Sequence, residues 1–216
     1  MPLSISDGAR DKLTHAGQFG IDVQVDTMEM LYDIDIDYWF RLSFGGFKDI
    51  IEAMGGVTVY SDYSFTAFDG TWFSEGENYL DGARALSFAR ERKSFSDGDL
   101  QRGRDQMKLI EAMIQKVVTL DFLTNYDQIL DAVANGFETT VPYDLLAEMV
   151  RYQLDDGGDW NVTCYLVSGP YDYQVTYSEP GLGERYVRWI DDEHMETARA
   201  LMKQVRDGET PRLPEK

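Results

Sequence analysis

The side chains of this sequence that are best suited to chemistry are arginines near its middle. Five of its thirteen arginines fall within 21 residues: Arg84, Arg90, Arg92, Arg102 and Arg104. Arg90 and Arg92 are two residues apart, so in an extended chain they point to the same side, whereas on a helix they would diverge by roughly 200°. Two guanidinium groups aimed at one point suit a phosphate or pyrophosphate, whose oxygens accept paired N–H bonds. The spacing therefore indicates an anion site in an extended segment.

A helix predicted over Asp99–Val118 brings further polar groups to the same place. Asp99 is expected to cap this helix after the turn Asp97-Gly98. Arg102 and Gln106 are four residues apart, so they share a helix face near the N-terminus, where free N–H groups and the helix dipole favour an anion. The arginine pair, Arg102 and Gln106 can then converge on one polyanion beside the Asp99 carboxylate. The alternative is a solvated helix start whose Arg and Asp side chains pair across the surface.

The charge balance limits the partners of such a site. The 216 residues carry a formal net charge of −19 and a pI of about 4.3, which repels nucleic acid and anionic membrane surfaces. We therefore expect no nucleic-acid partner, and an anionic ligand needs a local basic patch. The single cysteine, Cys164, excludes an internal disulfide and a cysteine-based metal site, and it is predicted to be buried. The two histidines, His15 and His194, are too isolated for a zinc site or a catalytic triad.

The sequence contains no apolar stretch of the roughly 18 residues that a membrane helix needs. Its first residues, Met-Pro-Leu-Ser-Ile-Ser-Asp-Gly, lack the basic and apolar regions of a signal peptide. We therefore expect a soluble chain without an anchor. The length suits a single domain over residues 1–206, followed by a proline-containing tail over residues 207–216.

The order of the predicted elements indicates a mixed α/β (α+β) fold, with a central β-sheet packed between helices. Helices are expected over Asp7–Phe19, from a capping box at Asp26–Glu29 to Tyr32, and over Phe47–Met54, Leu80–Phe88, Asp99–Val118, Asp121–Val133, Tyr143–Leu154 and Asp191–Val205. Strands are expected over Tyr38–Phe44, Val57–Tyr60, Thr163–Val167 and Tyr186–Ile190, with a loop or hairpin over Ser61–Glu77.

Two sets of apolar residues have more than one interpretation. The first is a dense aromatic set: Tyr60, Tyr63, Phe65, Phe68, Trp72, Phe73 and Tyr79. A packed hairpin is the favoured interpretation, and a rim for glycan stacking or a lipid-tail entrance is the alternative. The second is a stripe on the long helix: Met107, Ile110, Met113, Ile114 and Val117. Its helical spacing predicts core, which is compatible with the wall of an apolar pocket.

Several ordered motifs between Lys12 and Lys116 resemble the signature of the LytR–CpsA–Psr family. They are Leu80-Asp81-Gly82, Ala85-Leu86, Ala89-Arg90-Glu91-Arg92, Gly98-Asp99, Arg102 and Gln106, with Lys12-Leu13, His15-Ala16, Ile36-Asp37-Tyr38 and Phe47 through Met54-Gly55-Gly56-Val57 upstream. The family's Arg-x-Arg pair, its Gly-Asp-x-x-Arg step and the glutamine four residues later all appear in register.

The resemblance implies an extracytoplasmic phosphotransferase of the bacterial cell envelope. Such an enzyme moves a glycopolymer from a polyprenyl-pyrophosphate carrier to a hydroxyl of the cell-wall glycan, with the lipid tail in an apolar pocket. By the same resemblance Arg90, Arg92 and Gln106 bind the pyrophosphate. Asp99 and Arg102 are implied as catalytic residues, with Arg102 supporting the cluster and Asp99 acting in positioning or in acid–base transfer.

The family domain usually begins with strands and an Asp/Arg-rich segment that binds Mg²⁺. In this sequence Met1 is expected to correspond to a position after these segments, which predicts a partial domain. Mg²⁺ is expected for the family, but its ligands are not identifiable in this chain. Loss of paired strands exposes their edges and apolar faces, which predicts a covering partner chain or self-association. The alternative functions are a non-catalytic binder of polyprenyl-phosphate lipids and a transcription regulator, and the acidic balance argues against the latter.

Overall fold

The computed structural model describes residues 9–155, 157–158 and 160–214, which group into two compact units. Unit 1 consists of Met1–Asp37 and Tyr165–Lys216, and unit 2 consists of Tyr38–Cys164. Every residue predicted for the anion site lies in unit 2.

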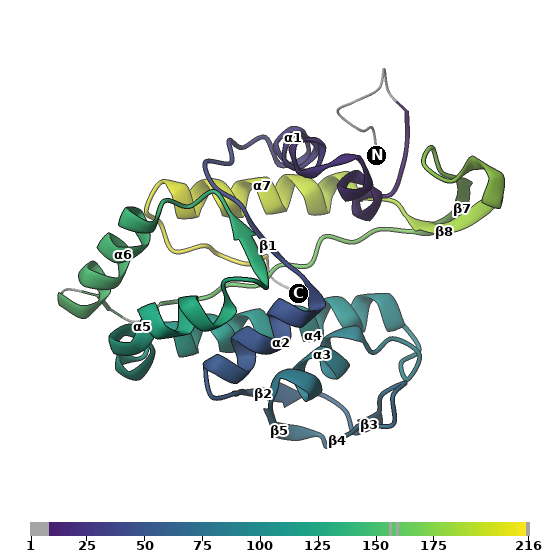
Figure 1. Cartoon of the computed structure of the whole chain (residues 1–216). Coiled ribbons are helices and arrows are strands. Elements are labelled where there is room, and N and C mark those ends of the chain that lie inside the picture. The colour runs from purple at the N-terminus through teal and green to yellow at the C-terminus, as the bar shows by residue number, and fades with distance from the viewer. Residues whose placement is uncertain (1–8, 156, 159, 215–216) are drawn as a thin grey trace. The chain divides into compact units, whose positions relative to one another are not determined.

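Unit 2 contains the helices and hairpins that position those residues (Figure 1). Along the chain it comprises β1 (Phe40–Leu42), α2 (Phe44–Ala53), β2 (Val57–Ser61), β3 (Phe65–Thr66), β4 (Trp72–Phe73), β5 (Gly76–Leu80), α3 (Gly82–Arg90), α4 (Gly98–Val117), α5 (Leu120–Val133), β6 (Phe137–Thr139) and α6 (Tyr143–Asp155). Helix α2 packs against α3, and α4 packs against both β2 and α3. The end of α3 and the start of α4 are therefore held on a common support.

The core of unit 2 is formed by the inward faces of two hairpins and three helices. β2 and β5 pair antiparallel with Val57 opposite Leu80, and their side chains alternate between buried and exposed. The ring centroids of Phe65 and Phe73, on the paired strands β3 and β4, lie 5.0 Å apart, and Phe73 lies 5.3 Å from Phe88 of α3. The other core members are Ile51, Met54, Val59, Ala67, Ala85 and Leu109. Each large apolar side chain buried here contributes roughly 1.5–3 kcal/mol, so the hairpins are anchored to α3.

Helix α3 begins at a side-chain cap and approaches α2 closely. The Asp81 carboxylate accepts a 2.8 Å hydrogen bond from the backbone N–H of Arg84, one of the donors that a helix start leaves unpaired. A Cβ atom at the next residue, Gly82, would lie 2.4 Å from the carbonyl oxygen of Lys48 in α2. Because only glycine permits this approach, Gly82 brings Lys48 next to α3.

Unit 1 joins N-terminal and C-terminal segments of the chain. It comprises η1 (Leu13–Phe19), α1 (Ile21–Tyr32), β7 (Tyr171–Val175), η2 (Pro180–Leu182), β8 (Glu184–Arg188) and α7 (Asp192–Arg206). Nδ1 of His15 lies 2.7 Å from Oδ1 of Asp11 and 2.8 Å from Oγ of Ser178. Arg199 of α7 donates two hydrogen bonds, of 3.1 and 2.7 Å, to the carbonyl oxygen of Leu31 in α1. Polar contacts thus connect the two segments within this unit.

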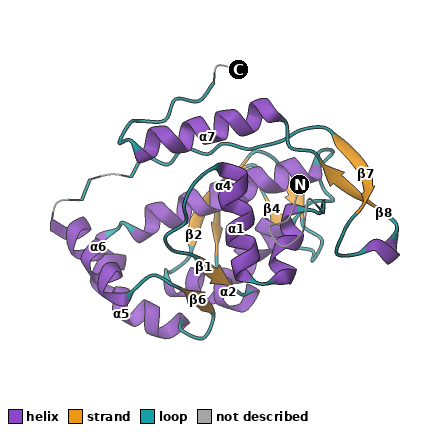
Figure 2. Ribbon diagram, turned by 90° about the horizontal axis from the view of Figure 1, so that it is seen from above, coloured by secondary structure: helices purple, strands orange, loops and turns teal. Residues whose placement is uncertain are grey.

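The fold is of the mixed α/β class, which confirms the prediction. The strands of the described residues pair two by two in four antiparallel sheets, β1–β6, β2–β5, β3–β4 and β7–β8, and not in one central sheet (Figure 2). Short pairs of this kind leave strand edges unpaired. Self-association of the chain stays a prediction, and a single sharp monomer boundary in sedimentation velocity would contradict it. In the described part of the chain, no helix has the length and apolarity needed to cross a membrane.

Two predicted helix starts in unit 1 differ from the structure. The helix predicted from Asp7 appears as the 3-10 helix η1, and Asp7 itself lies outside the described residues. The capping box predicted at Asp26–Glu29 is wrong, because α1 has already begun at Ile21. Glu29 instead accepts a 2.8 Å hydrogen bond from the backbone N–H of Ile36, beyond the end of the helix. Capping residues do not start a helix where the preceding turn is already helical.

Two strand predictions also need correction. Thr163–Val167 forms no strand, and Cys164 within it is half-buried rather than buried. The strand predicted over Tyr38–Phe44 is reduced to β1, because Oγ of Ser43 accepts a 3.0 Å hydrogen bond from the backbone N–H of Gly46 and starts α2 there. The remaining predicted helices and strands have counterparts whose ends differ by a few residues.

The two apolar sets divide between core and surface. Phe65 and Phe73 are buried, as a packed hairpin requires. The other members of the aromatic set are more than half exposed: Tyr60, Tyr63, Phe68, Trp72 and Tyr79. On α4 the buried apolar residue among those described is Leu109, whereas Ile110 of the predicted stripe is 54% exposed. The packed hairpin is therefore confirmed for two of its rings, and the stripe is only partly core.

Candidate functional site

Asp99 joins two of the predicted site arginines through one carboxylate oxygen. Its Oδ1 lies 3.4 Å from Nη1 of Arg92 and 3.2 Å from Nη2 of Arg102. Arg92 lies in the connection after α3, and Arg102 lies one turn beyond Asp99 on α4. The Arg92 side chain is 56% exposed and that of Arg102 is 37% exposed, so each pair contributes only about 0–1 kcal/mol to stability. These contacts therefore orient the two guanidinium groups, because the Asp99 carboxylate holds both of them at the start of α4.

The start of α4 packs tightly against Arg92. A Cβ atom at Gly98, the first residue of α4, would lie 2.0 Å from the carbonyl oxygen of Arg92, so this approach requires glycine. The N-cap position is Asp97, whose side chain makes no cap hydrogen bond. The prediction that Asp99 caps the helix is therefore wrong. Asp99 lies in the first turn, where the helix dipole favours a carboxylate, and its oxygen contacts the two arginines instead.

Gln106 contacts the end of α3 beside Arg90. Its Nε2 donates a 2.9 Å hydrogen bond to the carbonyl oxygen of Ala89, the residue before Arg90. Gln106 and Arg102 share a face of α4, as their spacing predicted. Within the described residues, Arg90 takes no part in the ion pairs of Asp99. The structure therefore joins three of the predicted residues directly and links Gln106 to Arg90 through the backbone.

The Arg90 guanidinium lies over two aromatic rings. Its central carbon is 4.8 Å from the ring centroid of Phe44 and 5.4 Å from that of Phe68, which are cation–π distances. Arg90 and Lys48 line a hollow of about 210 Å³. The other lining residues are Phe68, Asp69, Ala83, Leu86 and Ser87. A hollow of this size is smaller than a typical ligand pocket, about 300–1,000 Å³, and Arg90 is the one predicted site residue among its described lining residues.

Asp69 is an acidic side chain in this lining, and its carboxylate already accepts hydrogen bonds from within the protein. It accepts hydrogen bonds from the backbone N–H of Thr71, at 3.0 Å, and from the hydroxyl of Ser87, at 2.9 Å. The Thr71 hydrogen bond is the main reason why the pKa of Asp69 is lowered. Asp69 therefore stays ionised and holds the β3–β4 turn, and the hollow presents the cations of Lys48 and Arg90 beside this one carboxylate.

Lys48 and Phe44 were missed by reasoning from sequence. They are four residues apart, so on a helix they share one face. The helix was predicted to begin after Phe44, which placed that residue in a strand. Their relation to Arg90 depends on the packing of α2 against α3 at Gly82, and no local pattern contains that packing.

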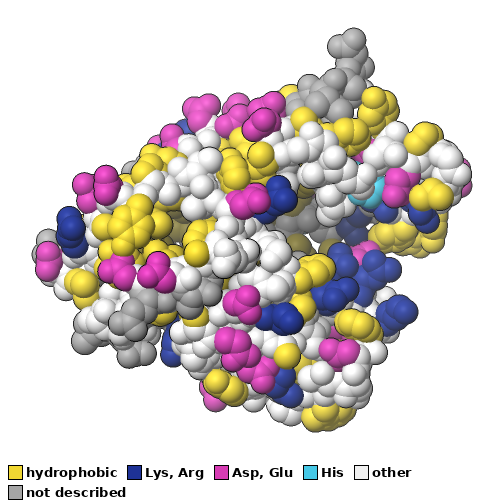
Figure 3. Space-filling model, viewed as in Figure 1, with side chains coloured by type: hydrophobic (Ala, Val, Ile, Leu, Met, Phe, Trp, Pro, Cys, Tyr) yellow, Lys and Arg dark blue, Asp and Glu magenta, His cyan; other side chains and the backbone are white. Residues whose placement is uncertain are grey.

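Basic side chains gather at this place in a strongly acidic chain. Figure 3 shows Lys and Arg side chains grouped over the α3–α4 connection and the start of α4. Two other arginines of the cluster are used for structure. Arg104 donates to Oδ2 of Asp97 at 3.1 Å and to Oε1 of Gln101 at 3.0 Å. Arg84 donates to the carbonyl oxygens of Tyr79 and Trp72.

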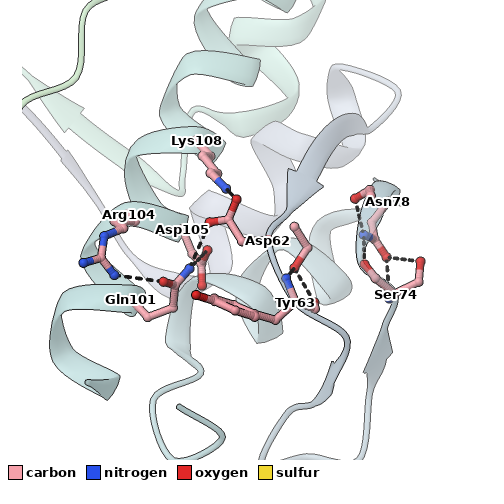
Figure 4. Close-up of polar contacts among 10 residues, drawn as sticks. Asp62, Tyr63, Ser74, Asn78, Gln101, Arg104, Asp105 and Lys108 are labelled. Carbon is pink, nitrogen blue, oxygen red and sulfur yellow. Dashed lines mark hydrogen bonds and ion pairs between the residues drawn. The ribbon is translucent and has the colours of Figure 1, made fainter. Parts of the chain in front are cut away.

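A partly buried polar set links α4 to Asp62, which follows β2 (Figure 4). Asp105 is 1% exposed, and its Oδ1 accepts a 2.9 Å hydrogen bond from Nε2 of Gln101, one turn earlier. Nζ of Lys108 lies 2.6 Å from Oδ1 of Asp62. Burial raises the pKa of Asp105 to about 6, because the charged carboxylate loses hydration. This set holds the part of α4 that carries Gln106.

Residues 3–176 match the model of the LytR_cpsA_psr family. The match spans most of the 216 residues and includes every predicted site residue. This chain belongs to the LytR–CpsA–Psr family. The family membership confirms the resemblance that the arginine motifs indicated.

Named LytR–CpsA–Psr relatives are teichoic acid transferases. The polyisoprenyl-teichoic acid–peptidoglycan teichoic acid transferase TagU of Bacillus cereus is 36% identical over 152 residues, which are 70% of this chain and 50% of that protein. TagU of Enterococcus faecalis is 36% identical over 149 residues, 68% of this chain and 48% of that protein. The crystal structure of Bacillus subtilis TagV matches with a TM-score of 0.76 and 25% identity, over 96% of this chain and 79% of TagV. The chain thus spans about half the length of the curated relatives that it matches.

The Mg²⁺ expected for the LytR–CpsA–Psr family has no candidate ligand set in the described ranges. There, no group of three or more His, Cys, Asp or Glu side chains is arranged to hold a metal ion. Mg²⁺ is often held by one or two carboxylates together with substrate phosphates, so the metal stays a prediction.

Proposed function

We propose that this chain binds the diphosphate of a polyprenyl-pyrophosphate-linked glycopolymer and transfers the glycopolymer to a cell-wall glycan at the cell envelope. The observation that carries the proposal is the group of basic side chains at the junction of α3 and α4, in a chain of net charge −19. The TagU relatives, whose name specifies transfer of teichoic acid to peptidoglycan, support the same class of substrate.

The diphosphate is bound by two arginine side chains and one glutamine amide, which come from three consecutive segments of the chain. Arg90 acts from the end of α3, Arg92 from the connection, and Gln106 from α4. Lys48 adds a fourth group from the wall of the hollow. Planar guanidinium groups match the paired oxygens of a phosphate, which explains why arginine suits this role better than lysine alone.

The reaction is a phosphoryl-type transfer. The acceptor hydroxyl oxygen bonds to the phosphorus that bears the glycopolymer, and the bond between this phosphorus and the bridging oxygen breaks. Polyprenyl phosphate leaves with the electron pair, and the hydroxyl proton passes to a base. Positioning and neutralisation of charge supply most of the catalysis in such transfers. Arg102 stabilises the developing negative charge, and Asp99, whose Oδ1 contacts the two arginines, orients the hydroxyl or accepts its proton through Oδ2.

The binding part of the proposal is tested with geranyl pyrophosphate, a soluble carrier analogue, by calorimetric titration. Arg90→Ala and Arg92→Ala are each expected to weaken binding about tenfold or more, because a charge-assisted hydrogen bond contributes about 1.5–3 kcal/mol. Arg104→Ala is the matched control, since it removes the same charge from the same region while its guanidinium is already bonded to Asp97 and Gln101. Equal losses in all three variants would show that only net charge matters and would contradict the proposal.

Transfer is tested separately, with a labelled glycopolymer on a polyprenyl-pyrophosphate carrier and with peptidoglycan as the acceptor. Label that moves to peptidoglycan and is lost with Arg102→Ala supports the transferase. Specific binding of the carrier without any transfer would instead support the non-catalytic lipid binder.

A further inference from the structure

The residue between the two site arginines is buried, whereas both of its neighbours are exposed. Glu91 is 1% exposed and is among the most completely buried large side chains of the described residues. Arg90 and Arg92 on either side reach the surface. An ionisable side chain is rarely buried to this degree unless hydrogen bonds compensate for the lost hydration. The partners of Glu91 therefore indicate what its burial achieves.

Both carboxylate oxygens of Glu91 accept hydrogen bonds from the backbone. Oε2 accepts from the N–H of Phe68 at 2.7 Å, and Oε1 accepts from the N–H of Ser94 at 2.8 Å. Burial by itself raises the pKa of Glu91, but the N–H groups of Ser94, Phe68 and Arg92 outweigh it and leave the pKa below its ordinary value. The side chain is thus a charged anchor held by amide groups.

These hydrogen bonds tie the arginine segment to the β3–β4 turn. Phe68 lies in this turn, and its ring supports the Arg90 guanidinium at 5.4 Å. Two further bonds join the same elements: Oγ of Ser94 donates to the carbonyl oxygen of Thr66 at 2.8 Å, and Oγ of Ser87 in α3 donates to Oδ1 of Asp69 at 2.9 Å. The turn is therefore fixed on both sides of Arg90.

The backbone at Glu91 determines the direction of its neighbours. Its φ of −66° and ψ of 137° are extended, and along an extended chain successive side chains point to opposite sides. When the Glu91 side chain is held inward, the Arg92 side chain is directed outward. Arg90, the last residue of α3, is exposed as well. One buried side chain thereby fixes the backbone between the two cations.

We infer that Glu91 is the positioning residue of the proposed diphosphate site: by binding the Phe68 and Ser94 amides, its carboxylate holds Arg90 and Arg92 toward one anion. This inference rests on the proposed function, because it assigns how the diphosphate is recognised. It predicts that Glu91 sets the preference for a diphosphate over a monophosphate, since a diphosphate offers each guanidinium group a phosphate of its own, whereas a monophosphate must share one phosphate between both.

The test compares the dissociation constants of geranyl phosphate and geranyl pyrophosphate, taken as a ratio, in the wild-type chain and in Glu91→Gln. The amide keeps the size of the side chain, but its NH₂ group faces a backbone donor. We expect the ratio to fall about fivefold or more. A merely structural role would reduce the fraction of active protein for both ligands alike and leave the ratio unchanged. Glu111→Gln on α4 is the control, because it removes an equal charge from an exposed position.

Phe68→Leu provides a second variant that does not depend on the folding of Glu91→Gln. Phe68 is 61% exposed, so the substitution leaves the core intact while it removes the ring beneath Arg90. We expect a smaller loss of diphosphate preference than in Glu91→Gln. An unchanged ratio in both variants, with the wild-type preference present and sensitive to Arg92→Ala, overturns the inference alone. A wild-type chain without any diphosphate preference, unaffected by Arg92→Ala, overturns the proposed function and the inference with it.

Discussion

The side-chain amide of Gln106 donates a hydrogen bond to the backbone carbonyl oxygen of Ala89, at 2.9 Å. Ala89 precedes Arg90, so this bond ties α4 to the end of α3 at the edge of the proposed site. On the other side of that connection, Asp99 of α4 contacts Arg92. The two helices are thus linked on both sides of the segment that carries the arginine pair. The geometry of the site therefore depends on how α3 and α4 are held together.

Gln106→Leu removes this donor and keeps a side chain of similar size. We expect binding of geranyl pyrophosphate to weaken about tenfold, because both a ligand contact and the tie to Ala89 are lost. Stability should change by less than about 1 kcal/mol, since Gln106 is exposed. Gln115→Leu is the matched control, because Gln115 makes the same type of bond from the same helix, to the carbonyl oxygen of Trp160. Equal losses of affinity in the two variants would remove Gln106 from the site.

Asp99→Asn separates binding from transfer. The Asp99 carboxylate competes with an anionic ligand for Arg92 and Arg102, which it contacts at 3.4 and 3.2 Å. The neutral amide should therefore leave diphosphate affinity unchanged or raise it a few-fold, whereas the transfer rate should fall about 10²-fold or more if Asp99 orients or deprotonates the hydroxyl. Titration and the transfer assay measure the two effects. Loss of binding together with transfer would show that Asp99 acts only by holding the arginines.

The relative placement of neighbouring site residues could be predicted from the sequence, because it depends on local backbone geometry. Arg90 and Arg92 flank one extended residue, and Arg102 and Gln106 are one helical turn apart. Glu91 could not be assigned from sequence. Its burial depends on the amide of Phe68, 23 residues away, and the sequence alone does not place the β3–β4 turn against the α3–α4 connection.

The incorrect elements have a similar cause. Thr163–Val167 is rich in apolar and β-branched residues, which favours a strand, but a strand needs a partner at the right distance. In the structure the hairpin forms later, where Tyr173 of β7 lies opposite Tyr186 of β8. Tertiary contacts decide which segments can pair as strands, whatever their local propensity, and the composition of a segment does not show whether a pairing partner is available.

Gly98→Ala tests the tight approach of α4 to Arg92. The added Cβ would lie 2.0 Å from a backbone oxygen, so the helix start must move. We expect a loss of about 1–3 kcal/mol in the free energy of unfolding, together with weaker diphosphate binding. Gly45→Ala is the control at an equivalent place near the start of α2, where the added Cβ would meet Oγ of Ser43 at an ordinary 3.6 Å. Urea denaturation measures the stability of the two variants, and equal stability would contradict the close approach of Gly98 to Arg92.

Asp105 makes the stability of the chain depend on pH. Its pKa is raised from 3.8 to about 6 by burial in the folded protein, whereas the unfolded chain keeps the lower value. Below about pH 4 the carboxyl is protonated in both states. Between pH 4 and pH 6 the folded protein holds the proton more tightly, so the contribution of Asp105 is largest at the acidic end and is lost as the pH rises through 6. One pKa unit corresponds to about 1.4 kcal/mol, which gives a total of up to about 3 kcal/mol.

Asp105→Asn removes this titration and keeps the acceptor for Gln101. The free energy of unfolding of the wild type, minus that of the variant, should therefore fall as the pH rises from 4 to 7. Urea denaturation at several pH values measures this difference, and it cancels the contributions of all other carboxyl groups that the two proteins share. Asp22→Asn, on an exposed position of α1, is the control for loss of one carboxylate, and its difference from the wild type should stay nearly flat. A flat difference for Asp105→Asn as well would mean that the charged form of the buried carboxyl is stabilised, most simply by Lys108. The part of α4 that carries Gln106 would then make no pH-dependent contribution to stability.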